Sequence, residues 1–183
     1  CVTDERIGRR QPHTTRQDEG MEIRTHAEYN ATVEEVFAVL TDPEFVAQTV
    51  IELSVAGHSY HVTEQSGTTV VDSRRTLSTA DMPDVARKFA GEVLTVDEEQ
   101  RWAAPRADGS RSAELSLRIE GVPVSLTGTI TLTPTGSGTL QDVVADLRAK
   151  VPLIGSTIER AAAPAIIAGI DAEADLARQW MNR

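Results

Sequence analysis

Hydrophobic and polar residues alternate in short runs through the middle of the chain, from about residue 53 to residue 150. Between Ala113 and Ile119 every second residue is apolar, which is the period of a strand with one covered face. Val124 to Leu132 repeats this period, with Gly128 on the apolar face leaving room for sheet curvature or the close approach of another group. Turns containing Gly, Asp or Ser separate the runs. The pattern predicts an antiparallel meander of six strands, at Leu53–Glu64, Thr68–Leu77, Val93–Ala104, Arg111–Gly121, Pro123–Pro134 and Gly138–Lys150.

A further strand and two short helices are predicted ahead of the meander. Residues 22–29 alternate loosely, as a strand does, and Asn30 or Thr32 can cap a helix that carries two glutamates in its first turn. Asp42 followed by Pro43 predicts the start of the second helix, because proline is tolerated at the first helical position.

The end of the chain predicts one long helix, from Val151–Gly155 to about Met181. At 1.5 Å per residue it would be ~45 Å long. Apolar residues recur along it at helical spacing, and its middle, Ala161–Ala168, is rich in alanine. Such small side chains leave two alternatives: the helix packs unusually close to the sheet, or a space remains beneath it.

Length and charge narrow the class of protein. The chain has 183 residues, so we expect one domain, residues 21–183, preceded by a polar, disordered tail at residues 1–20. A net charge of −10 argues against nucleic acid and anionic membranes as partners. The sequence has no apolar run of ~20 residues and no signal-peptide pattern, which leads us to expect a cytoplasmic protein. A single cysteine, Cys1, excludes an intramolecular disulfide.

The order of predicted elements resembles the START-like (SRPBCC, helix-grip) superfamily, which includes polyketide cyclases. The resemblance covers Met21 to Trp180. Within this superfamily, the chain is similar to one uncharacterised actinobacterial branch. The residues that carry this narrower similarity are Met82-Pro83, Lys88–Gly91, Trp102, Gly121–Val124, Gly128-Thr129, Val151–Gly155 and Ile158-Glu159. The resemblance to the superfamily implies an α+β fold, β-α-α-β6-α, in which a curved antiparallel sheet wraps around the long C-terminal helix. It also implies an internal cavity that holds lipids, sterols or polyketides.

Inward residues of the predicted sheet, helix and loop are the candidate ligand-binding residues. Each could equally be ordinary core, since most buried aliphatic side chains only pack. The loop Ser78–Glu92 is expected to contribute Phe89, and Trp102 to lie at the cavity mouth or in the packing. The full set is Tyr60, Arg74, Phe89, Trp102, Leu115, Leu117, Leu126, Ile130, Val143, Ile158, Ala162 and Ala165.

Polar residues on two predicted strands are the candidates for chemistry. His58 and His61 would point to opposite faces of a regular strand, so we expect no metal site there. His58 or Tyr60 could act as a general acid at the cavity, or be solvent-exposed. Arg74 and Arg75 would point to opposite faces of their strand, so one of them could face inward and recognise a carboxylate or phosphate; the alternative is an outward, salt-bridged arginine. An inward arginine could also be neutralised by Glu114 or Asp142 and would then be structural.

The sequence contains no phosphate loop, dinucleotide fingerprint, nucleophile elbow or zinc spacing. We therefore predict no catalytic residues and no cofactor. The leading hypothesis is a non-catalytic protein that binds or carries a small hydrophobic ligand, either a lipid or a polyketide-like molecule. The alternatives are a polyketide cyclase or dehydratase that uses the same cavity, and a protein-interaction module that docks a partner through residues 78–92.

Overall fold

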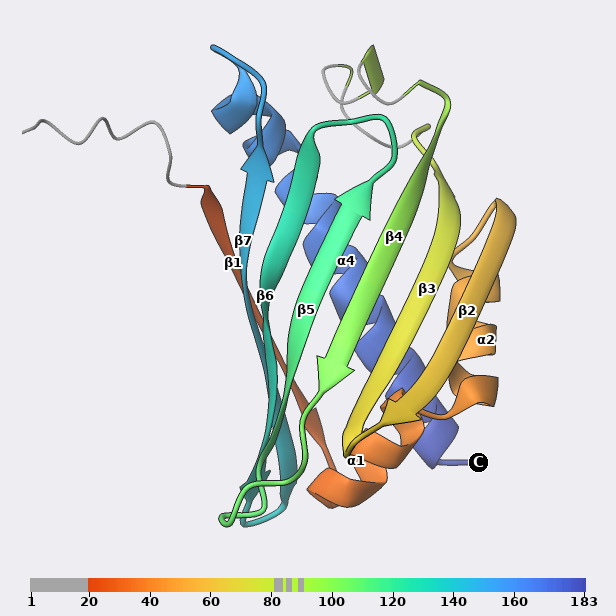
Figure 1. Cartoon of the computed structure of the whole chain (residues 1–183), viewed down its shortest axis with the longest axis vertical. Coiled ribbons are helices and arrows are strands. Elements are labelled where there is room, and N and C mark those ends of the chain that lie inside the picture. The colour runs from red at the N-terminus through yellow and green to blue at the C-terminus, as the bar shows by residue number, and fades with distance from the viewer. Residues whose placement is uncertain (1–19, 81–83, 85–86, 89–90) are drawn as a thin grey trace, which may run out of the picture.

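Seven strands and three helices form the fold of the computed structural model, which describes residues 20–80, 84, 87–88 and 91–183 (Figure 1). In chain order the elements are β1 (Met21–Tyr29), α1 (Val33–Leu40), α2 (Pro43–Glu52), β2 (Ala56–Gln65), β3 (Thr68–Ser78), β4 (Val93–Trp102), β5 (Arg111–Ile119), β6 (Val124–Thr135), β7 (Gly138–Ala149) and α4 (Gly155–Met181). The predicted β-α-α-β6-α order is confirmed.

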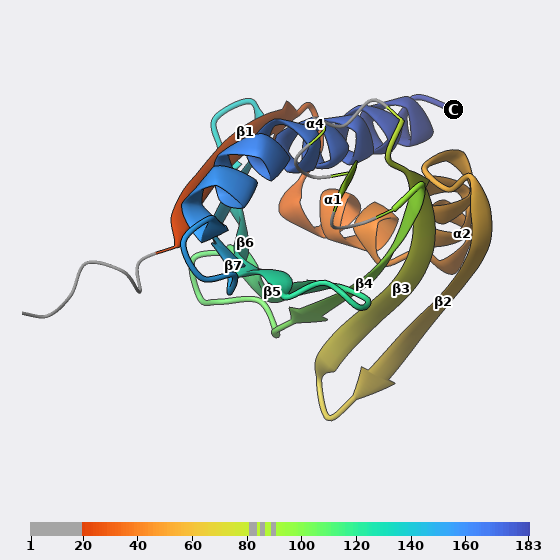
Figure 2. The same cartoon turned by 90° about the horizontal axis from the view of Figure 1, so that it is seen from above.

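The strands form one antiparallel sheet in the order β1-β7-β6-β5-β4-β3-β2. The meander β2–β7 pairs each strand with the next, while β1 joins the far edge by pairing with β7, Met21 opposite Leu147 and Tyr29 opposite Thr139. Seen from above, the sheet curves round and α4 lies across its open side (Figure 2). The predicted helix-grip architecture, α+β with a curved sheet around a long C-terminal helix, is confirmed.

Both short helices begin where their capping residues predict. Thr32 forms a capping box with Glu35: the Glu35 amide donates to the Thr32 hydroxyl at 3.3 Å, and the Thr32 amide donates to the Glu35 carboxylate at 2.8 Å. Asp42 caps α2, accepting from the Glu44 amide at 2.7 Å, with Pro43 at the first helical position. These local bonds set α1 and α2 directly after β1.

Gly128 of β6 lies in close contact with β7. A Cβ atom there would lie 2.2 Å from the Val144 carbonyl oxygen and 2.5 Å from the Ala145 Cα, so any side chain would push the two strands apart. The close approach predicted for this position is confirmed.

The two short helices fill one half of the space beneath the sheet. α1 packs against β6, β7 and α4, while α2 packs against β2, β3 and α4. Phe37 of α1 meets Trp102 of β4 edge to face, and Phe45 of α2 meets Trp180 of α4 in the same way, each with ring centroids 5.7 Å apart. This half is a closed, aromatic core.

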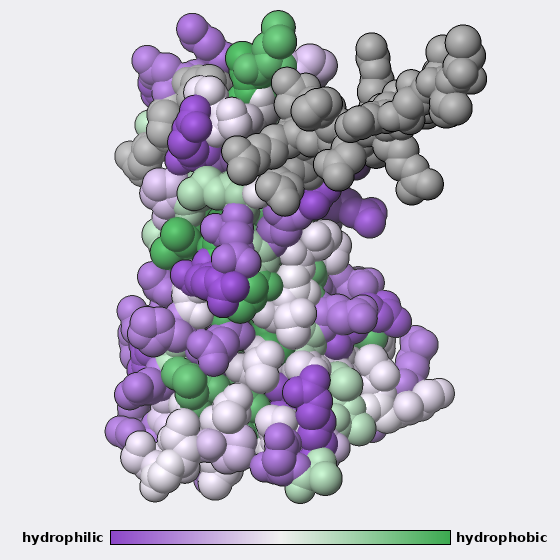
Figure 3. All heavy atoms as spheres, turned by 90° about the vertical axis from the view of Figure 1, so that its left-hand side faces the viewer, coloured by the Kyte–Doolittle hydropathy of each residue, from purple (hydrophilic) through white to green (hydrophobic). Residues whose placement is uncertain are grey.

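The surface on the side of β1 is mostly polar. Figure 3, which shows the side where β1 lies, has hydrophilic residues spread over it and hydrophobic residues in small separate groups. Among the described residues, no helix has the length and hydropathy needed to cross a membrane. Of the predicted tail, residues 1–19 lie outside the described residues, but Gly20 already contacts β7: a Cβ on it would lie 2.5 Å from the Leu147 carbonyl oxygen.

Candidate functional site

An apolar cavity of about 200 Å³ lies between α4 and the other half of the sheet. Its sheet side comes from β3, β4, β5 and β6, close to the ends of the strands that face away from α1. The residues around it are mainly Leu, Val, Ile and Ala: Leu53, Leu77, Leu94, Val96, Leu115, Leu117, Ile119, Val122, Val124, Leu126, Ile158, Ala162, Ala165, Ile166, Gly169 and Ile170, together with Arg75, Glu98 and Glu173.

Small residues on α4 keep the cavity open. Ala162, Ala165 and Gly169 face it from the helix, and a Cβ built on Gly169 would meet no atom within 4 Å. Glycine inside a helix is less stable than alanine by roughly 0.5–1 kcal/mol, and here no close packing requires it. Of the two alternatives left open by the alanine-rich sequence, the structure has the second, with a space beneath the helix.

A polar cluster lies at the inner end of the cavity, between the open half and the aromatic core. Arg75 of β3 and Glu98 of β4 form an ion pair with 2.5 Å between Nη2 and Oε2, and their side chains are only 12% and 9% exposed. Gln100 donates to Glu98 at 2.9 Å and accepts from the Trp102 indole N–H at 3.1 Å. Glu98, Gln100 and Trp102 alternate along β4, so all three lie on its inner face.

Glu173 of α4 completes this polar cluster. Burial, and to a smaller extent the negative charge of Glu98, raise the pKa of its carboxyl to about 7, although Arg75 and a hydrogen bond with Gln100 act in the opposite direction. The Glu98 carboxylate in turn raises the pKa of Arg75, which therefore stays a cation. The cavity thus contains a buried ion pair and a carboxyl whose pKa is raised by its burial.

A smaller space of about 20 Å³ adjoins the same cluster on the side of α2. It is bounded by Arg75, Glu98 and Glu173 and by Thr49 of α2. Thr49 is 4% exposed, and its hydroxyl has no hydrogen-bond partner within the described part of the chain. Thr49, with its unpartnered hydroxyl, and Glu173 thus line the same small space.

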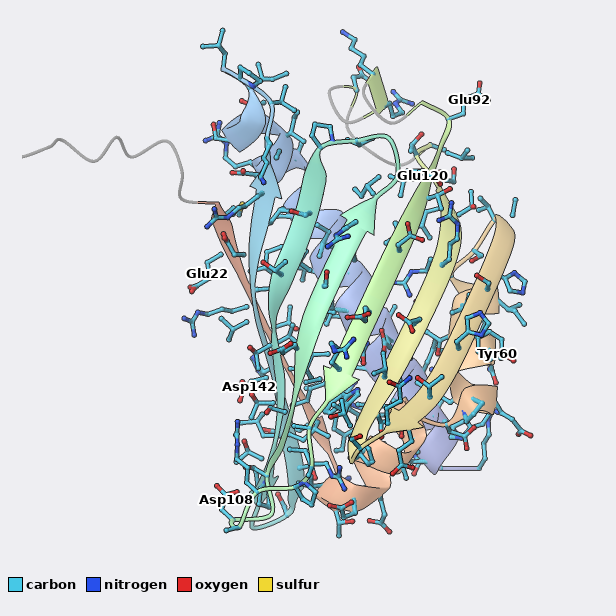
Figure 4. All side chains as sticks on the ribbon, in the orientation of Figure 1. Glu22, Tyr60, Glu92, Asp108, Glu120 and Asp142 are labelled. Atoms are coloured by element: carbon cyan, nitrogen blue, oxygen red, sulfur yellow. The ribbon has the colours of Figure 1, made fainter. Side chains whose placement is uncertain are left out.

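Half of the residues predicted to bind ligand line the cavity: Leu115, Leu117, Leu126, Ile158, Ala162 and Ala165. Trp102, Ile130 and Val143 do not, because they lie in the core half that α1 and α2 fill, with 0%, 5% and 1% exposure. Tyr60 lies half-buried on the edge strand β2 (Figure 4), away from the cavity. Phe89 lies outside the described residues.

The assignment of Arg74 as the inward arginine is corrected by the structure. Arg74 is 46% exposed on the outer face of β3, where it pairs with Asp97 at 2.8 Å and with Glu120, labelled in Figure 4. Its neighbour Arg75 faces the cavity, as alternation along a strand requires. The partner of the inward arginine is Glu98, and neither Glu114 nor Asp142 takes that role.

Neither histidine of β2 is at the cavity. His58 and His61 are both exposed, and no group of metal-binding side chains occurs among the residues that the structure describes. The interaction loop proposed for residues 78–92 falls partly outside the described residues. Its two ends are joined, since the Thr79 amide donates to the Glu92 carbonyl at 3.1 Å and the Thr79 hydroxyl donates to that of Gly91.

Arg75, Glu98 and Glu173 were not assigned from sequence, although two of them carried a usable signal. Glu98 is separated from Leu94, Val96 and Trp102 by even numbers of residues, so on a strand its side chain lies on the same inward face as theirs. Glu173 follows Ala162, Ile166 and Gly169 at steps of four, three and four residues, which places it on the same helix face.

Comparison with known families identifies the chain. The model of the family DUF2505, described as a protein of unknown function, matches residues 24–181. The chain belongs to the DUF2505 family. No curated protein matches this DUF2505 chain significantly in sequence, and the narrower resemblance to an actinobacterial branch stays a prediction.

Solved structures place the DUF2505 chain in the helix-grip fold. A STAR-related lipid transfer protein of Xanthomonas axonopodis superposes with a TM-score of 0.59 at 14% identity, over 88% of this chain and 86% of that one. The protein TTHA0849 of Thermus thermophilus superposes with a TM-score of 0.58 at 15% identity, over 87% of this chain and 95% of that one. DynU16, a protein of the dynemicin biosynthetic locus, superposes with a TM-score of 0.50 at 17% identity, over 88% of this chain and 47% of DynU16. At these identities the similarity shows the fold alone.

Proposed function

We propose that this DUF2505 protein binds and carries a small hydrophobic molecule in its internal cavity. The observation that supports the proposal is the apolar space of about 200 Å³ between α4 and the sheet. An apolar cavity of roughly 150 Å³ is enough to bind benzene. The lipid transfer protein that shares the fold is in keeping with a carrier role.

The volume sets the size of the ligand. Pockets for drug-sized molecules usually measure about 300–1,000 Å³, and this cavity, at about 200 Å³, is smaller. We therefore expect a compact ligand, a few atoms larger than benzene, in preference to a long-chain lipid. Cytoplasmic location and the exclusion of nucleic acid as a partner remain predictions from the charge and sequence.

Native mass spectrometry tests the proposal on protein purified from its own host. The wild-type chain should retain a small apolar mass, and Gly169→Phe should lose it, because the new ring would occupy the open space at this position. Gly136→Phe is the matched control, since Gly136 also has no neighbour within 4 Å and does not line the cavity. Equal retention by all three proteins would contradict binding in this cavity.

The polar cluster favours a second candidate, an enzyme of the cyclase or dehydratase type. A carboxyl with a pKa of about 7 beside a buried ion pair is suited to general acid–base work at neutral pH, and DynU16 belongs to a biosynthetic locus. In this version Glu173 is the acid–base group in place of His58, Tyr60 and Arg74, which lie away from the cavity. Glu173→Gln should then abolish turnover of a polyketide-like substrate while ligand binding persists.

A further inference from the structure

The polar cluster contains one more acid than base. Arg75 forms an ion pair with Glu98, and no other cation lies within ion-pairing distance of Glu173 in the described part of the chain. Removing a carboxylate from water is costly unless a cation and hydrogen bonds compensate it. When Glu173 is ionised, this end of the cavity therefore carries a net charge of −1.

The hydrogen bonds of the cluster leave acceptor capacity on Glu173. The two oxygens of Glu98 accept from Arg75 and Gln100, and the Gln100 carbonyl accepts from Trp102. A carboxylate accepts about four hydrogen bonds, and the contact that Glu173 makes here is with Gln100. Thr49, whose buried hydroxyl has no partner in the described part of the chain, lines the same small space as Glu173.

We propose that the ligand of this cavity is a small hydrophobic amine whose ammonium group pairs with Glu173. This inference rests on the proposed binding function and specifies its ligand. The ammonium would bring the charge of the cluster to zero, and its three donors would suit the free acceptors of Glu173 and Thr49. The apolar body would lie among Leu115, Ile166 and Ile170.

Other polar groups fit this end of the cavity less well. A ligand carboxylate would add a third acid to a cluster with one guanidinium, and like charges in a buried site repel strongly. A neutral hydroxyl could hydrogen-bond with Glu173 and would leave its charge uncompensated. Charge balance thus ranks the amine first, the alcohol second and the acid last.

Isothermal titration calorimetry of the full chain at pH 8 tests this order with three probes of similar shape: 2-phenylethylamine, 2-phenylethanol and 3-phenylpropionate. We expect the amine to bind at least tenfold more tightly than the alcohol, and the acid to bind most weakly. Glu173→Gln should weaken amine binding at least tenfold and change alcohol binding by less than threefold. Asp175→Asn is the control, because this exposed acid of the same helix pairs with Arg178 outside the cavity.

The pH dependence provides a second readout on the same samples. Because the pKa of Glu173 is about 7, its ionised fraction rises roughly tenfold from pH 6 to pH 8, and amine binding should strengthen by a similar factor. An alkylammonium stays protonated over this range, as Lys does with its pKa of about 10.4. The other groups that line the space beside Glu173 include Arg75, Glu98, Gln100 and Thr49, and the Tyr29 phenol on β1 is close enough for the charge of Glu173 to act on it. The Glu173→Gln variant should remove the pH effect.

The outcomes separate this inference from the proposed function. Alcohol or acid binding as tight as amine binding, or an amine affinity that Glu173→Gln leaves unchanged, would overturn the amine inference and keep the cavity as a ligand site. Failure of all three probes to bind wild-type protein would overturn the binding function, and the amine inference with it.

Discussion

The two halves of the space beneath the sheet differ in what the helices bring to them. On the side of α1 and α2, Phe37 packs against Trp102 and Phe45 packs against Trp180. On the other side α4 presents Ala162, Ala165 and Gly169, and a cavity of about 200 Å³ remains. The sheet and α4 thus border both a solid core, where α1 and α2 add aromatic side chains, and a hollow, where α4 presents small residues.

The Arg75–Glu98 pair and Glu173 lie on the boundary between these halves. A polar group at that position has packed aromatic rings on one side and empty apolar space on the other. The closed half can therefore hold the cluster rigidly while the open half brings a ligand to it. This division can be tested by four changes, taken in order of decreasing effect.

Removing an aromatic ring from the filled half should have the largest effect on stability. Trp102 is fully buried, so Trp102→Ala should lower the free energy of unfolding by about 3–5 kcal/mol, through lost burial and the cavity left behind. Tyr60→Ala, at the half-buried β2 edge, is the aromatic control and should cost about 1 kcal/mol. Urea denaturation measures both, and equal losses would show that the filled half is not a specially packed core.

Breaking the buried ion pair should cost more than breaking the exposed one on the same strand. Arg75→Met leaves Glu98 buried without its cation and should destabilise the fold by about 3 kcal/mol. Arg74→Met removes a surface pair that is 46% exposed on the arginine side, and it should cost less than about 1 kcal/mol. The difference between the urea midpoints of the two variants tests whether Arg75 and Glu98 are buried. A larger loss for Arg74→Met than for Arg75→Met would show that Arg74 is the inward arginine.

The stability of the protein should fall as the pH rises toward neutrality. In the unfolded chain Glu173 has an ordinary pKa of 4.5, and in the folded protein its pKa is about 7. The folded state therefore binds more protons between these values, and its extra stability is complete below about pH 4.5 and lost above about pH 7. We expect a decrease on the order of 2 kcal/mol from this group. Denaturation at several pH values should show it in wild type, and a Glu173→Gln protein with the same slope would contradict it.

The smallest effect should come from Gly169. Gly169→Ala should stabilise the protein by about 0.5–1 kcal/mol, because alanine favours the helix and its methyl group meets nothing within 4 Å. The same change at Gly121, where φ is +71°, should be destabilising. Thermal unfolding compares the two, and a loss of stability at Gly169 would show that the space beneath α4 is already filled.

The sequence predicted the fold more completely than the site. Strand periodicity, the Thr32 and Asp42 caps and the alanine-rich helix were enough for the elements, since each is a local signal. The inward arginine was misassigned because β3 contains two consecutive buried valines, Val70 and Val71, so the alternation does not show which face is inner. The boundary between the filled and open halves depends on where α1 and α2 pack, which no local pattern reveals, and this is why Ile130 and Val143 were wrongly expected at the cavity.

The pairing of β1 with β7 also affects how the chain is made. Residues 21–29 leave the ribosome well before their partners, residues 139–147, so strand β1 remains without its neighbour until most of the domain has been synthesised. Contacts between such distant parts of a chain form slowly, and strand edges exposed meanwhile are prone to aggregate. For this protein, a chaperone that shields the nascent N-terminal strand would improve the yield of folded molecules more than one that acts after release.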